Sequence, residues 1–513
     1  MPMNLRASLA YQPLELSFGT SGLRGLVTDM TDLECYINSA GFLLFLKQTE
    51  SLKKGAAVSI AGDLRKSTPR ILGAVIQAIE DTGFKAEYCG LIPTPALAFW
   101  AKEHNQPCIM VTGSHIPDDR NGIKFYKSSG EVLKQDEVTI QQAVATVRAD
   151  IYNSLENTFD SEGSLITFPE LPDPSPQPAA QFIKRFLAVI PANAFAGKHL
   201  VVYQHSAVGR DMLVEVLEKL GAKVTPVDRS DAFISIDTEN VTPEDQAHFH
   251  SIARQHPDTF AIVSTDGDSD RPFVIDEEGE FHRGDVLGFI VAKELAADFA
   301  AIPITSSDAV DSSLDKFHIA WQHTKIGSPH VIVAMQNALL QKFQKVVGWE
   351  VNGGFLTGTD LPYGNGILKA LPTRDAFLPI LIALYAAVKS SVSISQLFSA
   401  LPPRFTQAGL IDNFPQIDSQ KIIEKLSKND DGTQELITTC FGQDLGFEKI
   451  KKVDTTDGIR IFFSNNEIAH IRASGNAPQL RMYSVASSQK RADEIIELGI
   501  QAHGILTELQ ESV

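Results

Sequence analysis

The chain has 513 residues, of which 43% are hydrophobic and 21% charged, so it is long enough for several folded domains with apolar cores. Its 45 Lys and Arg and 63 Asp and Glu give a net charge of -18, which disfavours binding to duplex nucleic acid or to an anionic membrane because phosphates are repelled at long range. The longest apolar run, 377–388, is too short to cross a bilayer, the first residues lack a signal-peptide core, and the four cysteines form no Cys-x-x-Cys pair. We therefore expect a cytoplasmic protein without disulfides or a zinc site.

The first part of the chain alternates short apolar strands with helical patterns. A helix follows the capping candidates Thr31 and Asp32, strands are predicted at 56–61, 85–89 and 107–112, and further helices at 69–83 and 96–104. This alternation predicts parallel strands in a sheet that helices cover on both faces.

The same alternation returns twice. The second round predicts strands at 199–204, 223–227 and 259–264, with helices at 210–221 and 243–255. The third round predicts strands at 301–306, 321–326 and 346–350, with one helix that ends near 320 and another at 329–341. Each round closes with a strand that leads into a polar loop containing glycine, at 112–115, 265–268 and 350–354. Ligands of open parallel sheets lie beyond the carboxyl ends of the strands, so the three loops are expected to build one cleft together.

The last part of the chain has a different pattern. Two strands within 453–463 are joined by the Asp457-Gly458 turn, two more are predicted at 467–471 and 479–485, and one amphipathic helix runs from about Ser488 to Leu509. Strands followed by a helix predict a separate antiparallel α+β domain.

Three carboxylates stand at alternate positions in the segment Asp266-Gly-Asp268-Ser-Asp270-Arg271. If the loop curls, they can converge on a hard cation, and oxygen ligands suit Mg²⁺. A calcium EF-hand is disfavoured because Arg271 takes the place of the glycine that its sharp turn requires. An acidic solvated loop is the remaining interpretation of this segment alone.

The loop Thr112-Gly-Ser114-His115-Ile116-Pro117, followed by Lys124, places a hydroxyl beside an imidazole and a lysine. This arrangement suits a nucleophilic serine, although a serine in such a turn is more often a cap or turn residue.

Other segments could bind a phosphate. Arg472-Ala-Ser474-Gly475-Asn476-Ala-Pro478, with Arg481 beyond it, offers guanidinium, hydroxyl and backbone amide donors, but a β-turn with a surface arginine would look the same. The glycines between Phe18 and Gly25 match neither a dinucleotide fingerprint nor a P-loop. Lys325 and the segment 350–354 stand at strand ends and are ambiguous alone.

Taken in order, these segments from Phe18 to Tyr483 resemble the α-D-phosphohexomutase family, which includes phosphomannomutases, phosphoglucomutases and phosphohexosamine mutases. The resemblance implies a heart-shaped molecule around a central cleft, made of three similar mixed α/β sandwich units and a C-terminal antiparallel α+β domain. The expected domains are 1–170 with the phosphoserine loop, 178–284 with the metal loop, 285–401 with the sugar-recognition loop and 402–513 with the phosphate-binding loop.

The resemblance also implies a mutase that interconverts hexose 6-phosphate and hexose 1-phosphate (mannose, glucose or both). Catalysis would pass through a phosphoserine and a hexose 1,6-bisphosphate, with Mg²⁺ as cofactor, sugar phosphates as the only expected partners, and a monomer or dimer. The implied catalytic residues are Ser114, His115, Lys124 and Arg24; the metal ligands are Asp266, Asp268, Asp270 and Ser114; the substrate-binding residues are Arg271, Lys325, Glu350, Asn352, Arg472, Ser474, Gly475, Asn476 and Arg481.

The chain departs from the usual family loops at several positions. Gly113 and Ile116 replace alanine and asparagine beside the serine, and Asn476-Ala477 replace Thr-Glu in the phosphate loop. In the sugar loop, Asn352 and Gly354 stand where many phosphomannomutases carry serine and histidine. The pattern favours a phosphomannomutase with phosphoglucomutase activity; the alternatives are a phosphoglucosamine or phosphoacetylglucosamine mutase, a weakened sugar-phosphate-binding homologue, or a phosphatase.

Overall fold

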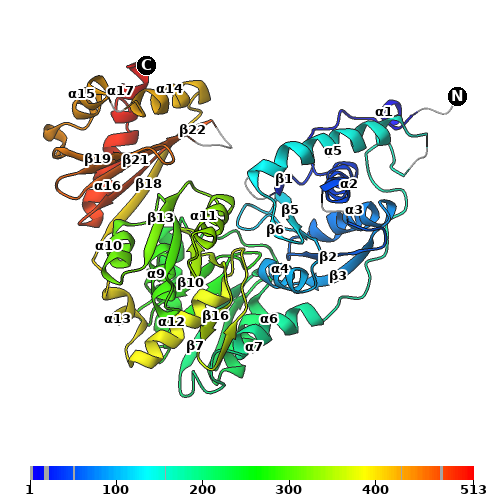
Figure 1. The fold of residues 1–513 in the computed structure, drawn as a ribbon, viewed down its shortest axis with the longest axis horizontal. Helices are drawn as coiled ribbons and strands as arrows, with labels where there is room; N and C mark the ends of the chain where they lie inside the picture. The colour runs from blue at the N-terminus through cyan, green and yellow to red at the C-terminus, as the bar shows by residue number, and fades with distance from the viewer. Residues whose placement is uncertain are drawn as a thin grey trace.

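The computed structural model describes residues 4–16, 22–49, 52–155, 158–428, 430–473 and 478–512. Figure 1 shows the chain as an open arc, with the N-terminal unit at one end, two units in the middle and the C-terminal unit at the other end. Among the described residues, no helix has both the length and the apolar character needed to span a membrane.

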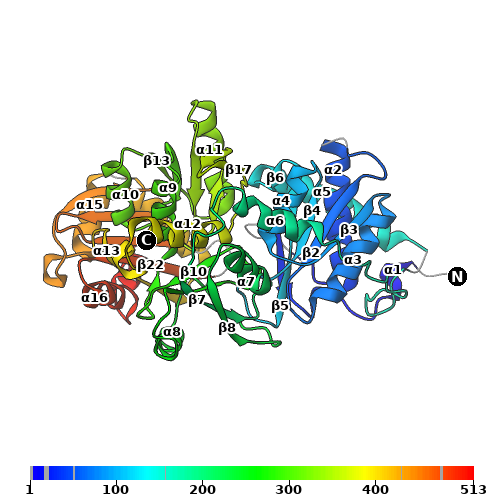
Figure 2. The same cartoon turned by 90° about the horizontal axis from the view of Figure 1, so that it is seen from below.

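The first unit is a mixed sheet between two layers of helices. Its strands are β1 (Gly22–Leu26), β2 (Ala57–Gly62), β3 (Lys85–Leu91), β4 (Cys108–Val111), β5 (Arg120–Lys127) and β6 (Gly130–Glu131); its helices are α1 (Leu5–Ser8), α2 (Asp32–Thr49), α3 (Thr68–Asp81), α4 (Thr94–Glu103) and α5 (Lys134–Asn153). Successive residues of β4 enter two different cores: Ile109 packs in the cluster that contains α2 and α3, and Met110 in the cluster that contains α4. The sheet is therefore covered on both faces, as predicted, and Figure 2 shows these helix layers on either side of it.

The second and third units are built in the same way. The second comprises α6 (Gln177–Leu187), β7 (His199–His205), α7 (Arg210–Lys219), β8 (Lys223–Arg229), α8 (Pro243–Gln255), β9 (Ala261–Thr265), β10 (Pro272–Ile275) and β11 (Phe281–His282). The third comprises α9 (Gly284–Glu294), β12 (Phe299–Pro303), α10 (Asp308–Lys316), β13 (Ala320–Thr324), α11 (Ser328–Leu340), β14 (Val346–Trp349), β15 (Phe355–Thr357), the hairpin β16 (Leu361–Tyr363) and β17 (Gly366–Leu368), α12 (Phe377–Ser390) and α13 (Ile394–Ser399).

One topology is common to the three sheets. Their strand orders contain β3-β2-β4-β5, β8-β7-β9-β10 and β13-β12-β14-β15, and in each the first three strands are parallel while the fourth is antiparallel. The prediction of three similar mixed α/β units is confirmed, and the parallel arrangement that the strand–helix alternation predicted holds for the first three strands but not for the fourth. The fourth strand follows each polar loop directly, so each loop is the turn of a hairpin.

All three α/β units contribute residues to the largest core. Helix α12 carries the longest apolar run of the sequence and is buried along almost its whole length, in a cluster that also includes residues of β7, β9, β12 and β14. A helix that is apolar on all sides is stable only inside such a core.

The C-terminal unit is a five-stranded antiparallel sheet in the order β18-β22-β21-β20-β19, as the α+β prediction requires. Its elements are β18 (Phe405–Asp412), α14 (Gln416–Leu426), α15 (Asp431–Cys440), a 3₁₀ turn (Gln443–Leu445), β19 (Ile450–Asp454), β20 (Ile459–Phe463), β21 (Ile468–Ala473), β22 (Gln479–Ala486), α16 (Gln489–Ile500) and α17 (Ile505–Glu511).

The single final helix predicted from Ser488 to Leu509 is wrong, because two helices are present. The chain becomes extended at Gln501, and His503 adopts a positive φ of 60°. A Cβ at Gly504 would lie 2.6 Å from the carbonyl oxygen of Leu498, so the chain can fold back against α16 only through a glycine. The apolar spacing continues across this turn, and for that reason the sequence pattern did not reveal it.

Candidate active site

The hairpin loops of the three α/β units meet at one place. Ser114 in the β4–β5 loop contacts Asp266 in the β9–β10 loop, and Asp270 of that same loop is joined through Arg374 to Glu350 in the β14–β15 loop. The expectation that these loops build one site together is therefore met by direct contacts.

Ser114 is held in an uncommon backbone conformation at the start of its loop. Its φ is 56°, its backbone N–H donates to Thr112 Oγ1 at 2.8 Å, and only 1% of the residue is exposed. Its Oγ donates to Asp266 Oδ2 at 2.7 Å and lies 3.3 Å from His115 Nδ1. A non-glycine residue held in the left-handed region by its surroundings is typical of a functional site.

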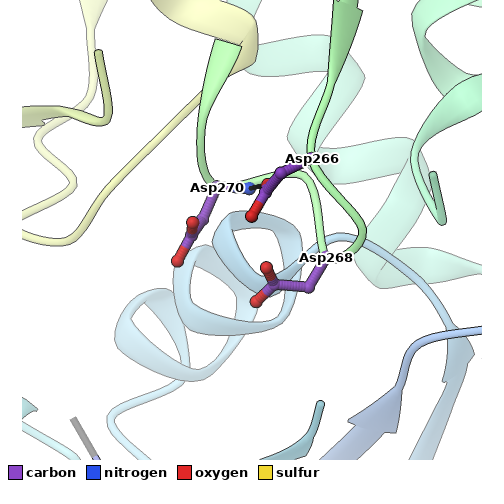
Figure 3. Close-up of side chains that lie close together, drawn as sticks. All are labelled: Asp266, Asp268 and Asp270. Atoms are coloured by element: carbon purple, nitrogen blue, oxygen red, sulfur yellow. Dashed lines mark hydrogen bonds between the residues drawn. The ribbon is translucent and has the colours of Figure 1, made fainter. Parts of the chain in front are cut away.

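The loop between β9 and β10 gathers three carboxylates. One oxygen from each of Asp266, Asp268 and Asp270 lies within 4.8 Å of the others, and Figure 3 shows the side chains turned toward a common space. All three residues are at most 1% exposed, and Oδ1 of both Asp268 and Asp270 has no hydrogen-bond partner among the described residues. Converging buried carboxylates with unpartnered oxygens fit a hard divalent cation such as Mg²⁺. Because strands and not helices flank this loop, the EF-hand interpretation fails.

The three carboxylates lie so close together that their negative charges repel one another. Burial, together with the charges of Asp268 and Asp270, raises the pKa of Asp266 well above its ordinary value. Burial acts in the same direction on Asp270, but Arg374, Lys124 and the adjacent arginine outweigh it and lower the pKa of that carboxyl. A divalent cation would relieve the repulsion that raises the pKa of Asp266.

Lys124 on β5 reaches into the aspartate cluster from the first unit. Its Nζ lies 2.6 Å from Asp268 Oδ2 and 2.8 Å from Asp270 Oδ2, and the side chain is 5% exposed. Burial disfavours the charged amine, but the two carboxylates outweigh it and raise the pKa of Lys124. The lysine is therefore charged at neutral pH in this arrangement.

Several cations lie near His115, the neighbour of Ser114. Arg24 on β1 is exposed and forms no ion pair within the described part of the chain. Burial, Arg271 and Arg24 lower the pKa of His115 to about 2, so its imidazole is neutral. Cations that repel one another at a buried serine favour an anionic ligand there.

Hydrogen bonds to neighbouring residues fix the conformation of the predicted sugar loop at 350–354. Arg374 Nη1 donates to Glu350 Oε2 at 2.8 Å. Asn352 Nδ2 donates to Glu239 Oε1 at 3.0 Å, and its Oδ1 accepts from the backbone N–H of Gly354 at 3.0 Å. Both ends of the Asn352 amide are thus used to shape the loop.

Comparison with known proteins agrees with this geometry. Models described as phosphoglucomutase/phosphomannomutase α/β/α domains I, II and III and the C-terminal domain match residues 15–150, 180–279, 283–405 and 416–498. Phosphomannomutases of Salmonella muenchen and Sinorhizobium fredii are 39% and 35% identical over 485 and 483 residues, which cover 94% of this chain in both cases and 94% and 98% of the relatives. The chain belongs to the phosphoglucomutase/phosphomannomutase family.

Solved structures show the same fold at low identity. A phosphoglucomutase/phosphomannomutase family protein of Burkholderia thailandensis has a TM-score of 0.72 at 18% identity and covers 96% of both chains. The Aspergillus fumigatus N-acetylphosphoglucosamine mutase, solved in complex with GlcNAc-6P and magnesium, has a TM-score of 0.59 at 13% identity and covers 99% of this chain and 97% of its own.

The loop that the family resemblance assigns to phosphate binding is only partly described. Ser474, Gly475 and Asn476 lie outside the described residues. Arg472 Nε lies 3.2 Å from Asp457 Oδ2, and that oxygen also accepts from the backbone N–H of Ile326, next to Lys325. The C-terminal unit therefore meets the third unit beside two of the predicted substrate-binding residues.

Arg481 and Arg472 remain apart from the cluster at Ser114. Arg481 on β22 donates to Gln479 at 3.1 Å. Within the described ranges, no hydrogen bond or ion pair joins either arginine to Ser114 or to the three aspartates.

Two arginines at the site were missed by sequence reasoning. Arg65, after β2, donates to the carbonyl oxygens of four residues in and beside the serine loop, namely Ser114, Ile116, Pro117 and Arg120. Arg374, before α12, bridges two of the other loops. The available signals were weak: Asp63-x-Arg65 directly follows a buried strand, and Arg374-Asp375 directly precedes the longest apolar run.

Proposed function

We propose that this chain is a phosphohexomutase that interconverts hexose 6-phosphate and hexose 1-phosphate through phospho-Ser114 and a hexose 1,6-bisphosphate. Mannose phosphates are the proposed preferred substrates, since two curated relatives at 35–39% identity are phosphomannomutases, and glucose phosphates are the proposed second substrates. The supporting observation is the 2.7 Å contact between Ser114 Oγ and Asp266 Oδ2 in a buried cluster of three aspartates and one lysine.

In the proposed transfer, the bond between phosphorus and Ser114 Oγ breaks while a bond forms between phosphorus and a sugar hydroxyl oxygen. The hydroxyl proton leaves to a nearby base, and the serine oxygen takes a proton when the phosphoryl group has left. Neutral His115, 3.3 Å from Ser114 Oγ, is placed to take part in this exchange, whereas Lys124 is charged and can donate a proton. The bisphosphate then reorients, and the second phosphoryl group returns to the serine.

The other residues have charge-balancing and binding roles in this proposal. Mg²⁺ held by Asp266, Asp268 and Asp270 would neutralise charge on the transferring phosphoryl group. Arg24 and Arg271 would attract the dianion, Glu350 would accept hydrogen bonds from sugar hydroxyls, and the remaining phosphate would bind at the C-terminal loop. The residues assigned to that loop are Lys325, Arg472, Ser474, Gly475, Asn476 and Arg481.

The proposed domains are 1–170, 178–284, 285–401 and 402–513, so that each contributes one loop to the reaction. Closure of the last domain over the bound sugar would exclude water, which would otherwise hydrolyse the phosphoenzyme.

A coupled assay tests the proposal. Purified protein with Mg²⁺ and catalytic glucose 1,6-bisphosphate should convert mannose 1-phosphate and glucose 1-phosphate to the 6-phosphates, and Ser114→Ala should abolish conversion while the protein stays folded. Comparing kcat/KM for the mannose, glucose and N-acetylglucosamine 1-phosphates identifies the preferred sugar. Binding without turnover would favour the weakened homologue, and stoichiometric release of inorganic phosphate would favour a phosphatase; either result would refute the mutase proposal.

A further inference from the structure

Arg374 enters the site from the segment between β17 and α12 and lies between two of the loops. Its Nε donates to Asp270 Oδ2 at 3.0 Å, its Nη2 lies 2.9 Å from the same oxygen, and its Nη1 donates to Glu350 Oε2 at 2.8 Å. The residue is 5% exposed, as is Glu350, and Asp270 is 1% exposed. One guanidinium therefore joins a predicted metal ligand to the acidic residue of the sugar loop.

The sugar loop leaves room for this arginine at a glycine. A Cβ at Gly354 would lie 2.7 Å from both Cγ and Cδ of Arg374, although the φ of Gly354 is not in the left-handed region. Glycine is therefore required here for space and not for backbone conformation. Many phosphomannomutases, as noted above, carry histidine at this position, so in this chain the arginine stem occupies space that a side chain at 354 would need.

A further contact links Arg374 to the first unit indirectly, through Ser328. Its Nη1 lies 3.3 Å from Ser328 Oγ at the start of α11, and that hydroxyl donates to Glu131 Oε2 on β6 at 2.6 Å. Ser328 and Glu131 are also buried, so Arg374 contacts residues of the second and third units directly and is linked to the first through Ser328.

We propose that Arg374 is the positioning residue that couples the sugar loop to the metal loop in this chain. It holds the Glu350 carboxylate in the orientation that accepts hydrogen bonds from sugar hydroxyls, and it balances part of the negative charge at Asp270. This inference rests on the proposed function, because it assigns the sugar-binding role to the same loop.

The shape of the guanidinium group explains why an arginine is needed. Its planar set of donors reaches two carboxylates that lie in different directions, whereas a lysine amine at the same place can satisfy one of them well. Without the guanidinium donors, the Glu350 carboxylate is free to rotate. Without the positive charge of the arginine, less of the negative charge on Asp270 is neutralised.

Titration calorimetry on the full-length protein tests both parts of the role without relying on turnover. Mannose 1-phosphate and glucose 1-phosphate should bind about tenfold more weakly to Arg374→Lys and Arg374→Gln than to the unaltered chain. Mg²⁺ alone should bind several-fold more tightly to Arg374→Gln, because a competing cation is removed, and with unchanged affinity to Arg374→Lys. In a cycle with Glu350→Gln, the double variant Arg374→Gln/Glu350→Gln should bind sugar phosphate no more weakly than Glu350→Gln alone.

Unchanged sugar-phosphate affinity in Arg374→Gln, or losses that multiply in the double variant, would overturn the positioning role. Weaker Mg²⁺ binding in Arg374→Gln would overturn the charge-balancing role. If Arg374→Gln fails to fold, Gly354→Ala provides an independent test, since its Cβ should displace the arginine stem and weaken sugar-phosphate binding by a similar factor. Absence of mutase turnover in the unaltered chain would refute the proposed function, and the binding titrations would still decide the role of Arg374.

Discussion

Replacement of Arg65 by lysine tests whether the serine loop is held in place from the neighbouring strand end. Arg65 is fully buried and donates to Ser114 O at 2.9 Å, Ile116 O at 2.5 Å, Pro117 O at 2.7 Å and Arg120 O at 2.9 Å. Its Nε also donates to the Asp63 carboxylate at 3.2 Å. That carboxylate accepts from Thr112, whose hydroxyl oxygen in turn accepts from the backbone N–H of Ser114. One side chain thus supports Ser114 by two routes.

The size of the effect follows from these hydrogen bonds. A lysine amine has its donors at one point and cannot replace all of the contacts of Arg65, so at least two of the carbonyl contacts are lost. Hydrogen bonds to a charged group contribute about 1.5–3 kcal/mol each, so the loss is about 3 kcal/mol or more. If the misplacement of Ser114 raises the activation free energy by about 3 kcal/mol, turnover decreases by about 100-fold.

The assay combines initial mutase rates with the rate at which glucose 1,6-bisphosphate phosphorylates Ser114, followed by mass spectrometry. Arg70→Lys is the matched control, because Arg70, on the α3 helix that follows Arg65, also donates to backbone carbonyls, at Val27 and Met30, but its side chain is 36% exposed and has no hydrogen bond to the serine loop among the described residues. We expect Arg65→Lys to slow both rates and Arg70→Lys to leave them within about threefold. Equal losses in the two variants, or a rate for Arg65→Lys within about threefold of the unaltered chain, would refute the reasoning.

Two further predictions concern stability. Mg²⁺ at about 100 times its Kd should stabilise the folded chain by about 2.7 kcal/mol, seen as a higher unfolding temperature, and Asp268→Asn should lose this response. Without metal, the variant should be less stable than the unaltered chain, because buried Lys124 loses one of its two charged partners. Asp285 accepts from Arg283 and from the backbone N–H groups of Val286 and Ser307, and these contacts hold its pKa below the ordinary value although burial opposes them. Its contribution to stability is therefore complete above the unfolded-state pKa of about 4 and is lost as the pH falls through the lower folded-state pKa. Asp285→Asn should cost about 3 kcal/mol at pH 7 in urea unfolding, and a difference that persists undiminished toward pH 3 would contradict this account.

Local chemistry made much of the site predictable from the sequence. The triplet Asp266, Asp268 and Asp270 is contiguous, and Ser114 stands in a short turn after an apolar strand, so neighbouring residues reveal both segments. The periodicity of the three strand–helix rounds likewise predicted three α/β units, because burial on both faces of a sheet demands apolar strands. The final helix was predicted wrongly at His503 and Gly504, where a tight turn leaves the apolar spacing unbroken.

The amino-acid sequence by itself determined the order of the α/β units, the antiparallel C-terminal domain and the loops that carry Ser114 and the aspartates. Tertiary structure alone decided how those loops are held. Arg65 contacts Ser114, which lies 49 residues away, and Arg374 lies 104 residues from Asp270 and 24 from Glu350. Their roles arise from the long reach of a buried guanidinium toward acceptors on other strands, and such contacts leave no periodic or local pattern along the chain.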